Sequence, residues 1–339
     1  MKEIQSLILR ITERCNLKCA YCYAADSGCT PKDMSVEMAL SAVSLCCPEG
    51  GSLRIQFTGG EPLLNVELME AVFAFGRKTN RRLRLAIQTN GTLLSRDTCH
   101  RLSTMGCAVG VSLDGLQHAN RLRVFSDGEA SFPHIIQGIR NLGDAGIRCN
   151  LTTVVTGVNA GSLGQLPDLA LWLGNVSGVG LDLFRPLGRG IGQEFAPAET
   201  DLKHGLTELI RKTEEIQSTG IRFRLRELER LKKLLAADSH NGLYCYAQTE
   251  RSMCVDAAGN CWPCSSLAGH KDFLLGNIRD GLPGSSDCRK ALASPQRCQS
   301  CAAFDACLGG CPAGRISLGG EPDRMTCVIN RTLLEERMK

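Results

Sequence analysis

The sequence predicts an α/β protein in which an open, partial (β/α)6 barrel precedes a small cysteine-rich C-terminal domain. Two observations carry this prediction. Short β-branched or apolar runs alternate with stretches of helical period about every 30 residues, which is typical of βαβ units around a parallel sheet. The cysteines are unevenly placed, and ten of the 19 lie from Cys245 to Cys327, where periodicity is weak.

Each expected element can be placed by residue range. Strands are predicted at 7–12, 53–58, 83–89, 107–113, 149–156 and 179–187. Helices are predicted at 66–78, 95–105, 132–145 and 164–173, and then at 199–218 and 224–237. Six units are too few to close an eight-unit barrel, so we expect an open barrel over 1–198. We expect a helical linker over 199–242, and a domain over 243–339 that metals rather than a core hold together.

Composition excludes several classes of partner. The 39 basic and 35 acidic side chains leave a net charge of +4, spread without the basic stripe that nucleic acid or an anionic membrane requires. No apolar run approaches the roughly 18 residues of a membrane span, and no signal-peptide core follows Met1. We therefore expect a cytoplasmic protein, whose many thiols are metal ligands or catalytic groups rather than disulfides.

Three cysteines lie together in the loop after the first predicted strand, as Cys15-x3-Cys19-x2-Cys22. Three thiolates on one short loop suit a cubane iron–sulfur cluster, which usually takes four protein ligands. One iron is then left open, as in catalytic metal sites. The alternative is a structural zinc loop that Cys29 or a histidine completes.

The segment 15–22, which reads CNLKCAYC, resembles the signature of the radical S-adenosylmethionine (SAM) superfamily. The resemblance implies that these three cysteines hold a [4Fe-4S] cluster whose open iron binds SAM. It also implies reductive cleavage of SAM to a 5'-deoxyadenosyl radical that abstracts hydrogen from a substrate. The protein would then position the cofactor and the substrate and exclude water from them.

Polar residues and glycines end the predicted strands, where barrel enzymes keep their active sites. Strand two ends in Gly59-Gly60-Glu61-Pro62, which resembles the GGEP motif that binds the methionine amino group; an ordinary turn is the alternative. Where related enzymes read His-Asp, this chain has Ala119-Asn120. The remaining expected SAM contacts are Gln88 and Asn90 at the rim, Ser112 and Arg123 at the ribose and carboxylate, and Tyr21 and Leu187 at the adenine.

The C-terminal cysteines form a second pattern. Cys245-x13-Gly259-x4-Cys264 precedes Cys298-x2-Cys301-x5-Cys307-x3-Cys311-x15-Cys327, which resembles a SPASM domain with two auxiliary [4Fe-4S] clusters. By that resemblance the outer cluster takes Cys298, Cys301, Cys307 and Cys327, and the inner cluster takes Cys245, Cys264 and Cys311. The fourth ligand of the inner cluster is Cys254, Cys261 or the substrate. Paired thiolates bind zinc equally well, so a zinc-ribbon-like module is the alternative.

The resemblance implies a maturase that oxidises, crosslinks or epimerises a peptide or protein substrate, with a flavodoxin- or ferredoxin-type electron donor. An alternative is an anaerobic sulfatase-maturing enzyme, although those carry Asp where this chain has Ser265. Two further hypotheses are a SAM-binding scaffold and a zinc-held binding module without catalysis. Cys29 is a candidate hydrogen-donating thiol. Because the first strand begins near Met1, we expect the barrel and SPASM surfaces, or a separate protein, to hold a precursor peptide.

Overall fold

The computed structural model describes residues 4–24, 30–236, 243–249, 251–283 and 287–337. Its strands form one sheet in the order β10-β9-β8-β1-β2-β3-β4-β5-β6-β7. The six parallel strands that the sequence predicts are all present, within a few residues of the expected bounds. They are β1 (Ser6–Thr12), β2 (Ser52–Gly59), β3 (Arg82–Thr89), β4 (Ala108–Ser112), β5 (Cys149–Val155) and β6 (Val176–Leu183). The predicted open barrel is thereby confirmed.

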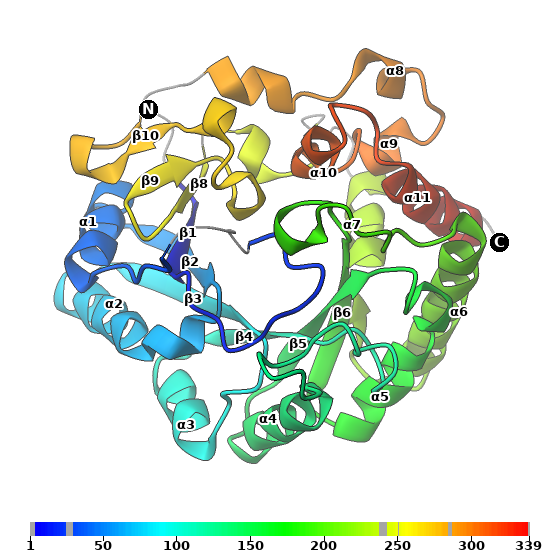
Figure 1. Ribbon diagram of the computed structural model, residues 1–339, viewed down its shortest axis with the longest axis horizontal. Helices are drawn as coiled ribbons and strands as arrows, with labels where there is room; N and C mark the ends of the chain where they lie inside the picture. The colour runs from blue at the N-terminus through cyan, green and yellow to red at the C-terminus, as the bar shows by residue number, and fades with distance from the viewer. Residues whose placement is uncertain (1–3, 25–29, 237–242, 250, 284–286, 338–339) are drawn as a thin grey trace.

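Helices lie outside the arc of strands (Figure 1). In chain order they are α1 (Val36–Cys46), α2 (Val66–Lys78), α3 (Arg96–Thr104), α4 (Phe132–Asp144), α5 (Gln165–Leu173), α6 (Glu199–Ser218) and α7 (Arg226–Leu235). Helix α1 was not predicted, although Ser35 caps it by accepting a hydrogen bond from the Met38 amide. Ser95 caps α3 in the same way.

The core lies between the strands and this outer layer of helices. Along β1, Leu7, Leu9 and Ile11 are fully buried and belong to the main apolar cluster, which also takes in buried side chains of α1 and α2. Alternate side chains of a strand point to opposite faces, so the intervening residues, such as Arg10, face the barrel interior. Because β1 to β6 are parallel, their carboxyl ends meet at one rim, where the loop after β1 also lies.

The sheet continues through both predicted domain boundaries. Strand β7 (Arg224–Leu225) pairs with β6, and β8 (Ser252–Val255) pairs in parallel with β1. Strands β9 (Asn260–Trp262) and β10 (Gly276–Asn277) extend this edge. The predicted linker helix α6 packs on α5 and on the C-terminal helix α11 (Arg324–Arg337). Strands of two and four residues are too short to show a period of two, which is why the sequence did not predict them.

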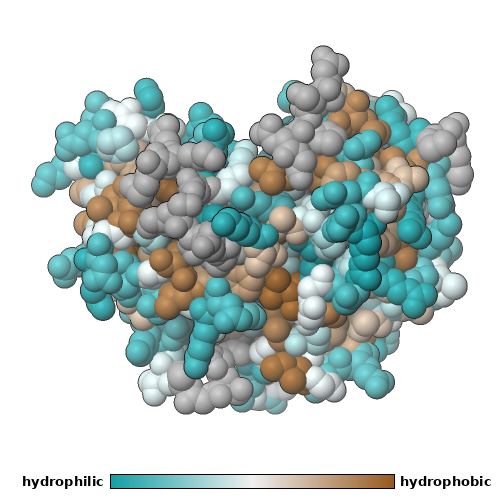
Figure 2. Space-filling model, turned by 90° about the horizontal axis from the view of Figure 1, so that it is seen from above, coloured by the Kyte–Doolittle hydropathy of each residue, from teal (hydrophilic) through white to brown (hydrophobic). Residues whose placement is uncertain are grey.

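The remaining C-terminal helices are α8 (Gln296–Gln299), α9 (Phe304–Cys307) and α10 (Pro312–Ser317), and this region lies across the top of the barrel in Figure 1. Seen from above, a notch separates two lobes, and hydrophilic and hydrophobic residues are interspersed on both of them (Figure 2). None of the helices in the described ranges combines the length and apolar character that a membrane crossing requires.

Candidate functional site

The loop after β1 holds Cys15, Cys19 and Cys22 close enough for their charges to influence one another. Burial raises the pKa of the Cys15 thiol to about 11. Hydrogen-bond donors nevertheless point at its sulfur, because the Leu17 amide lies 3.4 Å from Cys15 Sγ and Asn90 Nδ2 lies 3.9 Å from it. Such donors favour a thiolate, which is the form that binds metal. Cys29 lies outside the described residues.

A buried ion pair supports the second cysteine of this loop. Arg123 Nη1 lies 3.9 Å from Cys19 Sγ, while Arg123 Nε donates to Asp114 at 3.1 Å. Tyr21 donates its hydroxyl hydrogen to the same carboxylate, and the Val154 amide donates to it at 2.9 Å. Burial disfavours a charged guanidinium, yet the charge of Asp114 raises the pKa of Arg123 overall. Arg123 is therefore a fixed cation beside the loop.

The end of β2 connects the glycines to Cys15. Gly59 has a φ of +142°, and a Cβ atom on Gly60 would lie 2.1 Å from the carbonyl oxygen of Arg14, so neither position accepts another side chain without displacing the loop. Glu61 is fully buried and accepts hydrogen bonds from Thr89 Oγ1 and from the Asn90 and Leu63 amides. Its carboxylate thus orders the strand ends that surround Cys15.

Other predicted SAM contacts lie at the same rim. Gln88 Nε2 donates to Ser112 Oγ at 3.0 Å, and Thr152 donates to Gln88 Oε1 at 3.3 Å, which joins the ends of β3, β4 and β5. Leu187 lines a cavity described below. Tyr21 is only 6% exposed and packs with Leu17 and Cys19 beneath the loop. The adenine contacts of Tyr21 and Leu187 stay predictions.

The structure brings the inner group of C-terminal cysteines together. Cys245, Cys264 and Cys311 border one small apolar cluster, and burial together with the charges of Cys311 and Cys245 raises the pKa of Cys264 to about 12. Of the two candidate fourth ligands, Cys254 pairs with Trp262 and Cys261 pairs with Val255 across β8 and β9, so the two thiols lie on opposite faces of the sheet. Cys261 belongs to the main core, near Cys46 of α1, whereas Cys254 is near enough to Cys264 to be influenced by its charge. The geometry therefore favours Cys254 over Cys261.

The outer group also converges. Cys298, Cys301, Cys307 and Cys327 line one cavity. Burial and the charges of Cys327 and Cys298 raise the pKa of Cys307 to about 11. These four thiols are therefore available to one metal centre, and their arrangement alone does not select between an iron–sulfur cluster and zinc.

Arg315 lies among both groups of cysteines and is 3% exposed. Its guanidinium donates to four backbone carbonyls, those of Leu292, Ala293, Gly309 and Gly310, at 2.6 to 3.0 Å. It forms no ion pair with a carboxylate of the described residues. Burial lowers the pKa of Arg315, while the charges of Cys298, Cys311, Cys307 and Cys245 act in the opposite sense.

A cavity of about 490 Å³ lies between the first cysteine loop and the C-terminal region. Tyr23, which follows Cys22, and Ser265, which follows Cys264, both line it and are joined by a side-chain hydrogen bond. Arg185 stacks 6.0 Å from the Tyr23 ring and approaches Cys311 Sγ at 3.8 Å. These contacts connect the first cysteine loop to the inner group.

Sequence reasoning missed several of these residues. Tyr23 directly follows Cys22, and Arg315 lies four residues after Cys311. A basic residue inside a cysteine-rich segment is a signal that could have identified Arg315. Asp114 directly follows the strand predicted at 107–113. Its role depends on Arg123 folding back toward Cys19, which spacing along the chain does not reveal.

The fold and site together define a partial-barrel protein whose first cysteine loop lies at the carboxyl ends of parallel strands. A family model of the radical SAM superfamily matches residues 9–170. An uncharacterized protein of Methanocaldococcus jannaschii is 31% identical over 82% of this chain and 90% of its own. The chain belongs to the radical SAM superfamily: it is an enzyme that binds SAM and a [4Fe-4S] cluster.

Two further likenesses extend over nearly the whole chain. The mycofactocin maturase MftC of Mycolicibacterium smegmatis is 26% identical over 92% of this chain and 79% of its own. The structure of native anSMEcpe with bound AdoMet superposes with a TM-score of 0.84 at 24% identity, over 98% of this chain and 97% of that one. The same protein has also been solved with AdoMet and a peptide named Cp18Cys. The structural likeness shows a shared fold that includes the cysteine-rich C-terminus.

Proposed function

We propose that this chain is a radical SAM maturase with a SPASM-type C-terminal domain that modifies a peptide or protein substrate. Cys15, Cys19 and Cys22 would hold the SAM-binding cluster, and the two C-terminal groups would each hold an auxiliary [4Fe-4S] cluster. When bound, these groups supply the reductive cleavage of SAM and the abstraction of hydrogen from the substrate. A flavodoxin- or ferredoxin-type protein would supply the electron.

The single observation that carries this proposal is the buried cation Arg315. Four backbone carbonyls accept from its N–H groups, but they leave its positive charge unpaired, and an unpaired charge away from water is costly unless negative charge lies close by. Neutral thiols do not provide that charge, whereas cysteines bound to a metal are thiolates. Its position among four cysteines of both groups therefore fits metal-bound thiolates on either side, and the match to the radical SAM family favours [4Fe-4S] clusters over zinc. The donors aimed at Cys15 and Cys19 support the same interpretation at the first loop.

The protein's own residues would position the cofactors and exclude water. Asp114 fixes Arg123 against Cys19, and Glu61 fixes Asn90 against Cys15. Gly59 and Gly60 keep the end of β2 in contact with the loop backbone. The cavity of about 490 Å³ that Tyr23 and Ser265 line is large enough for a side chain of a substrate peptide.

A peptide substrate is supported by the relatives, since one is named as a maturase and the fold is shared with a protein solved with a bound peptide. The sulfatase-maturing alternative is less favoured, because Ser265 carries no acidic group and its hydroxyl is engaged with Tyr23.

The proposal is tested on one anaerobically reconstituted sample. We expect about twelve irons per chain for three cubane clusters, little zinc, and 5'-deoxyadenosine on reduction in the presence of SAM. Cys19→Ala should lose the product and about a third of the iron, while Cys99→Ala, at a buried helix position far from the cysteine groups in sequence, should keep both. Stoichiometric zinc without 5'-deoxyadenosine would establish the zinc-held module instead. Product formation that survives Cys19→Ala would refute the assignment of the first loop.

A further inference from the structure

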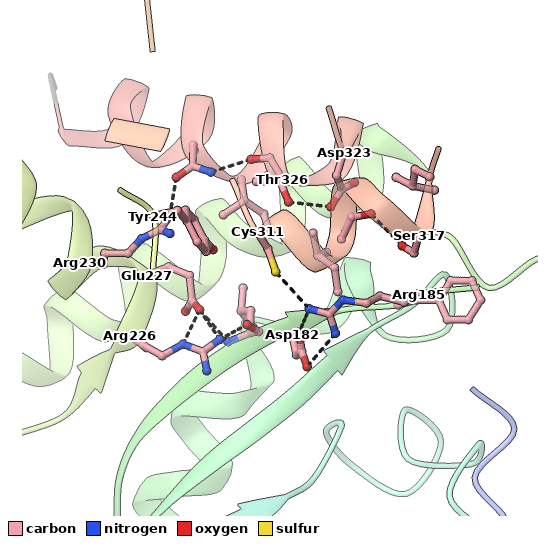
Figure 3. Close-up of a pocket in the computed structure, with 17 residues that line it drawn as sticks. Asp182, Arg185, Arg226, Glu227, Arg230, Tyr244, Cys311, Ser317, Asp323 and Thr326 are labelled. Carbon is pink, nitrogen blue, oxygen red and sulfur yellow. Dashed lines mark hydrogen bonds and ion pairs between the residues drawn. The ribbon is translucent and has the colours of Figure 1, made fainter. Parts of the chain in front are cut away.

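A second cavity, of about 310 Å³, is not used by the chemistry above. It lies between the end of β6, helix α7 and the C-terminal helices α10 and α11 (Figure 3). Cys311 of the inner group forms part of its wall, and Asn330 lines both this cavity and the one that the outer cysteines surround. The space therefore lies beside both groups of C-terminal cysteines.

Six of the 17 residues that line it are charged, and most of these six are already paired. Asp182 accepts from Arg185 at 2.8 Å, and Glu227 accepts from Arg226 at 2.7 Å. Asp323 accepts from the Thr326 hydroxyl and the Met325 amide at the start of α11. These pairs are seen around the cavity in Figure 3.

Arg230 is the exception. Its guanidinium lies 4.2 Å from the centre of the Tyr244 ring, and its Nη2 donates to Asn330 Oδ1 at 2.9 Å. It makes no ion pair with a carboxylate in the part of the chain that the structure describes. An aromatic face and an amide thus hold this cation in one orientation, which prepares it to bind an anion.

Three buried polar atoms of side chains that line this cavity have no hydrogen-bond partner among the described residues: Arg230 Nε, Arg185 Nε and Glu227 Oε2. Glu227 is 8% exposed, and its other oxygen accepts from the Leu181 amide and from Arg226. Buried polar atoms in native proteins nearly always have partners, and a group of exceptions around one cavity indicates a ligand that supplies them. That ligand must bring an acceptor for the guanidinium groups and a donor for Glu227.

We propose that this cavity binds a carboxylate that has an N–H donor close to it, with the carboxylate on Arg230 and the N–H on Glu227. The inference deepens the proposed function, on which it rests, by naming a chemical feature of the substrate. A phosphate fits less well, because Glu227 repels its greater negative charge. The feature occurs at the C-terminal residue of a peptide and at an internal aspartate or glutamate, so the test must separate these sources.

The experiment measures dissociation constants of small probes on the reconstituted enzyme by ligand-observed NMR. N-acetylglycine carries both groups, N-acetylglycinamide lacks the carboxylate, and propionate lacks the N–H. We expect N-acetylglycine to bind at least tenfold more tightly than either, and inorganic phosphate to bind more weakly still. Equal binding of N-acetylglycine and its amide, tighter binding of phosphate, or no binding of any probe would overturn the proposal.

Variants assign the contacts. Arg230→Gln should weaken the binding of N-acetylglycine at least tenfold and leave the binding of N-acetylglycinamide unchanged. Glu227→Gln should weaken the binding of N-acetylglycine but not that of propionate. Arg211→Gln, on an exposed face of α6, is the matched control. If Arg230→Gln fails to fold, Glu227→Gln alone decides, and unchanged binding in it rejects the site.

Two tripeptides then identify the source, one with a free C-terminus and neutral side chains, the other amidated with an internal aspartate. Tighter binding of the first assigns a chain end, and tighter binding of the second assigns an acidic side chain. Binding of neither would contradict the assignment to a peptide substrate. 5'-Deoxyadenosine is measured on the same sample: its absence with intact probe binding would reject the proposed function but not the carboxylate site.

Discussion

Replacing Asp114 by Asn tests whether a buried ion pair supports the first cysteine loop. The carboxylate is 2% exposed and accepts from Arg123, Tyr21 and the Val154 amide, while Arg123 is 7% exposed. An Asn side chain keeps one acceptor oxygen but turns a donor toward other donors and leaves the guanidinium unpaired. Removing one partner of a buried pair costs about 3–5 kcal/mol. We expect the free energy of unfolding to fall by roughly that amount, and the iron content of the first site to fall with it.

The assay is urea unfolding of the metal-free chain, followed by iron analysis after anaerobic reconstitution. Asp127→Asn, the same change at an exposed loop position, is the control and should behave as the wild type. The double variant Asp114→Asn with Arg123→Gln should be less destabilised than the sum of the single changes, because each single change already breaks the same pair. A loss below about 1 kcal/mol for Asp114→Asn, or strict additivity in the double variant, would refute the reasoning.

Three further predictions concern the same region and its C-terminal neighbour. Burial raises the pKa of Glu61 from 4.5 to about 7. Between these two pH values the folded chain therefore binds more protons than the unfolded chain. The free energy of unfolding should fall as the pH rises from 4.5 to about 7, by up to roughly 1.4 kcal/mol per pH unit. The urea midpoint of Glu61→Gln should not fall with pH over this range. The same fall in Glu61→Gln as in the wild type would contradict the assignment of the pH dependence to Glu61. Gly60→Ala, which sets a Cβ 2.1 Å from the Arg14 carbonyl, should displace the loop and lower iron binding. Gly161→Ala, where the nearest atom to the new Cβ is 3.9 Å away, should not. Cys254→Ser should remove iron from the inner auxiliary site while Cys261→Ser leaves it, and the reverse pattern in Mössbauer spectra would assign Cys261 instead.

Much of the barrel could be predicted because its strands and helices have clear periods. Strand β1 alternates fully buried apolar residues with others, and α2 and α6 begin and end at the predicted residues. The grouping of the C-terminal cysteines was also predictable, since short spacings such as Cys298-x2-Cys301 keep ligands close whatever the fold.

Contacts between distant segments could not be predicted in this way. The choice between Cys254 and Cys261 depends on which face of β8 and β9 each thiol occupies, and spacing does not determine that face. Likewise, Arg315 and Arg230 are single basic residues in the sequence, and only the fold shows that no carboxylate of the described chain pairs with either. The sheet pairing of β8 with β1 joins residues more than 240 positions apart.

That pairing has a practical consequence for dissecting the molecule. Strand β1, which leads into the first cysteine loop, is flanked by β2 on one side and by β8 on the other. Truncation before β8 would expose one edge of β1 and leave the backbone amides and carbonyls of that edge without partners. Such an exposed edge promotes edge-to-edge association of chains. The N-terminal half expressed by itself should therefore aggregate or mispair, and the two halves are better regarded as a single cooperative folding unit than as modules to be exchanged.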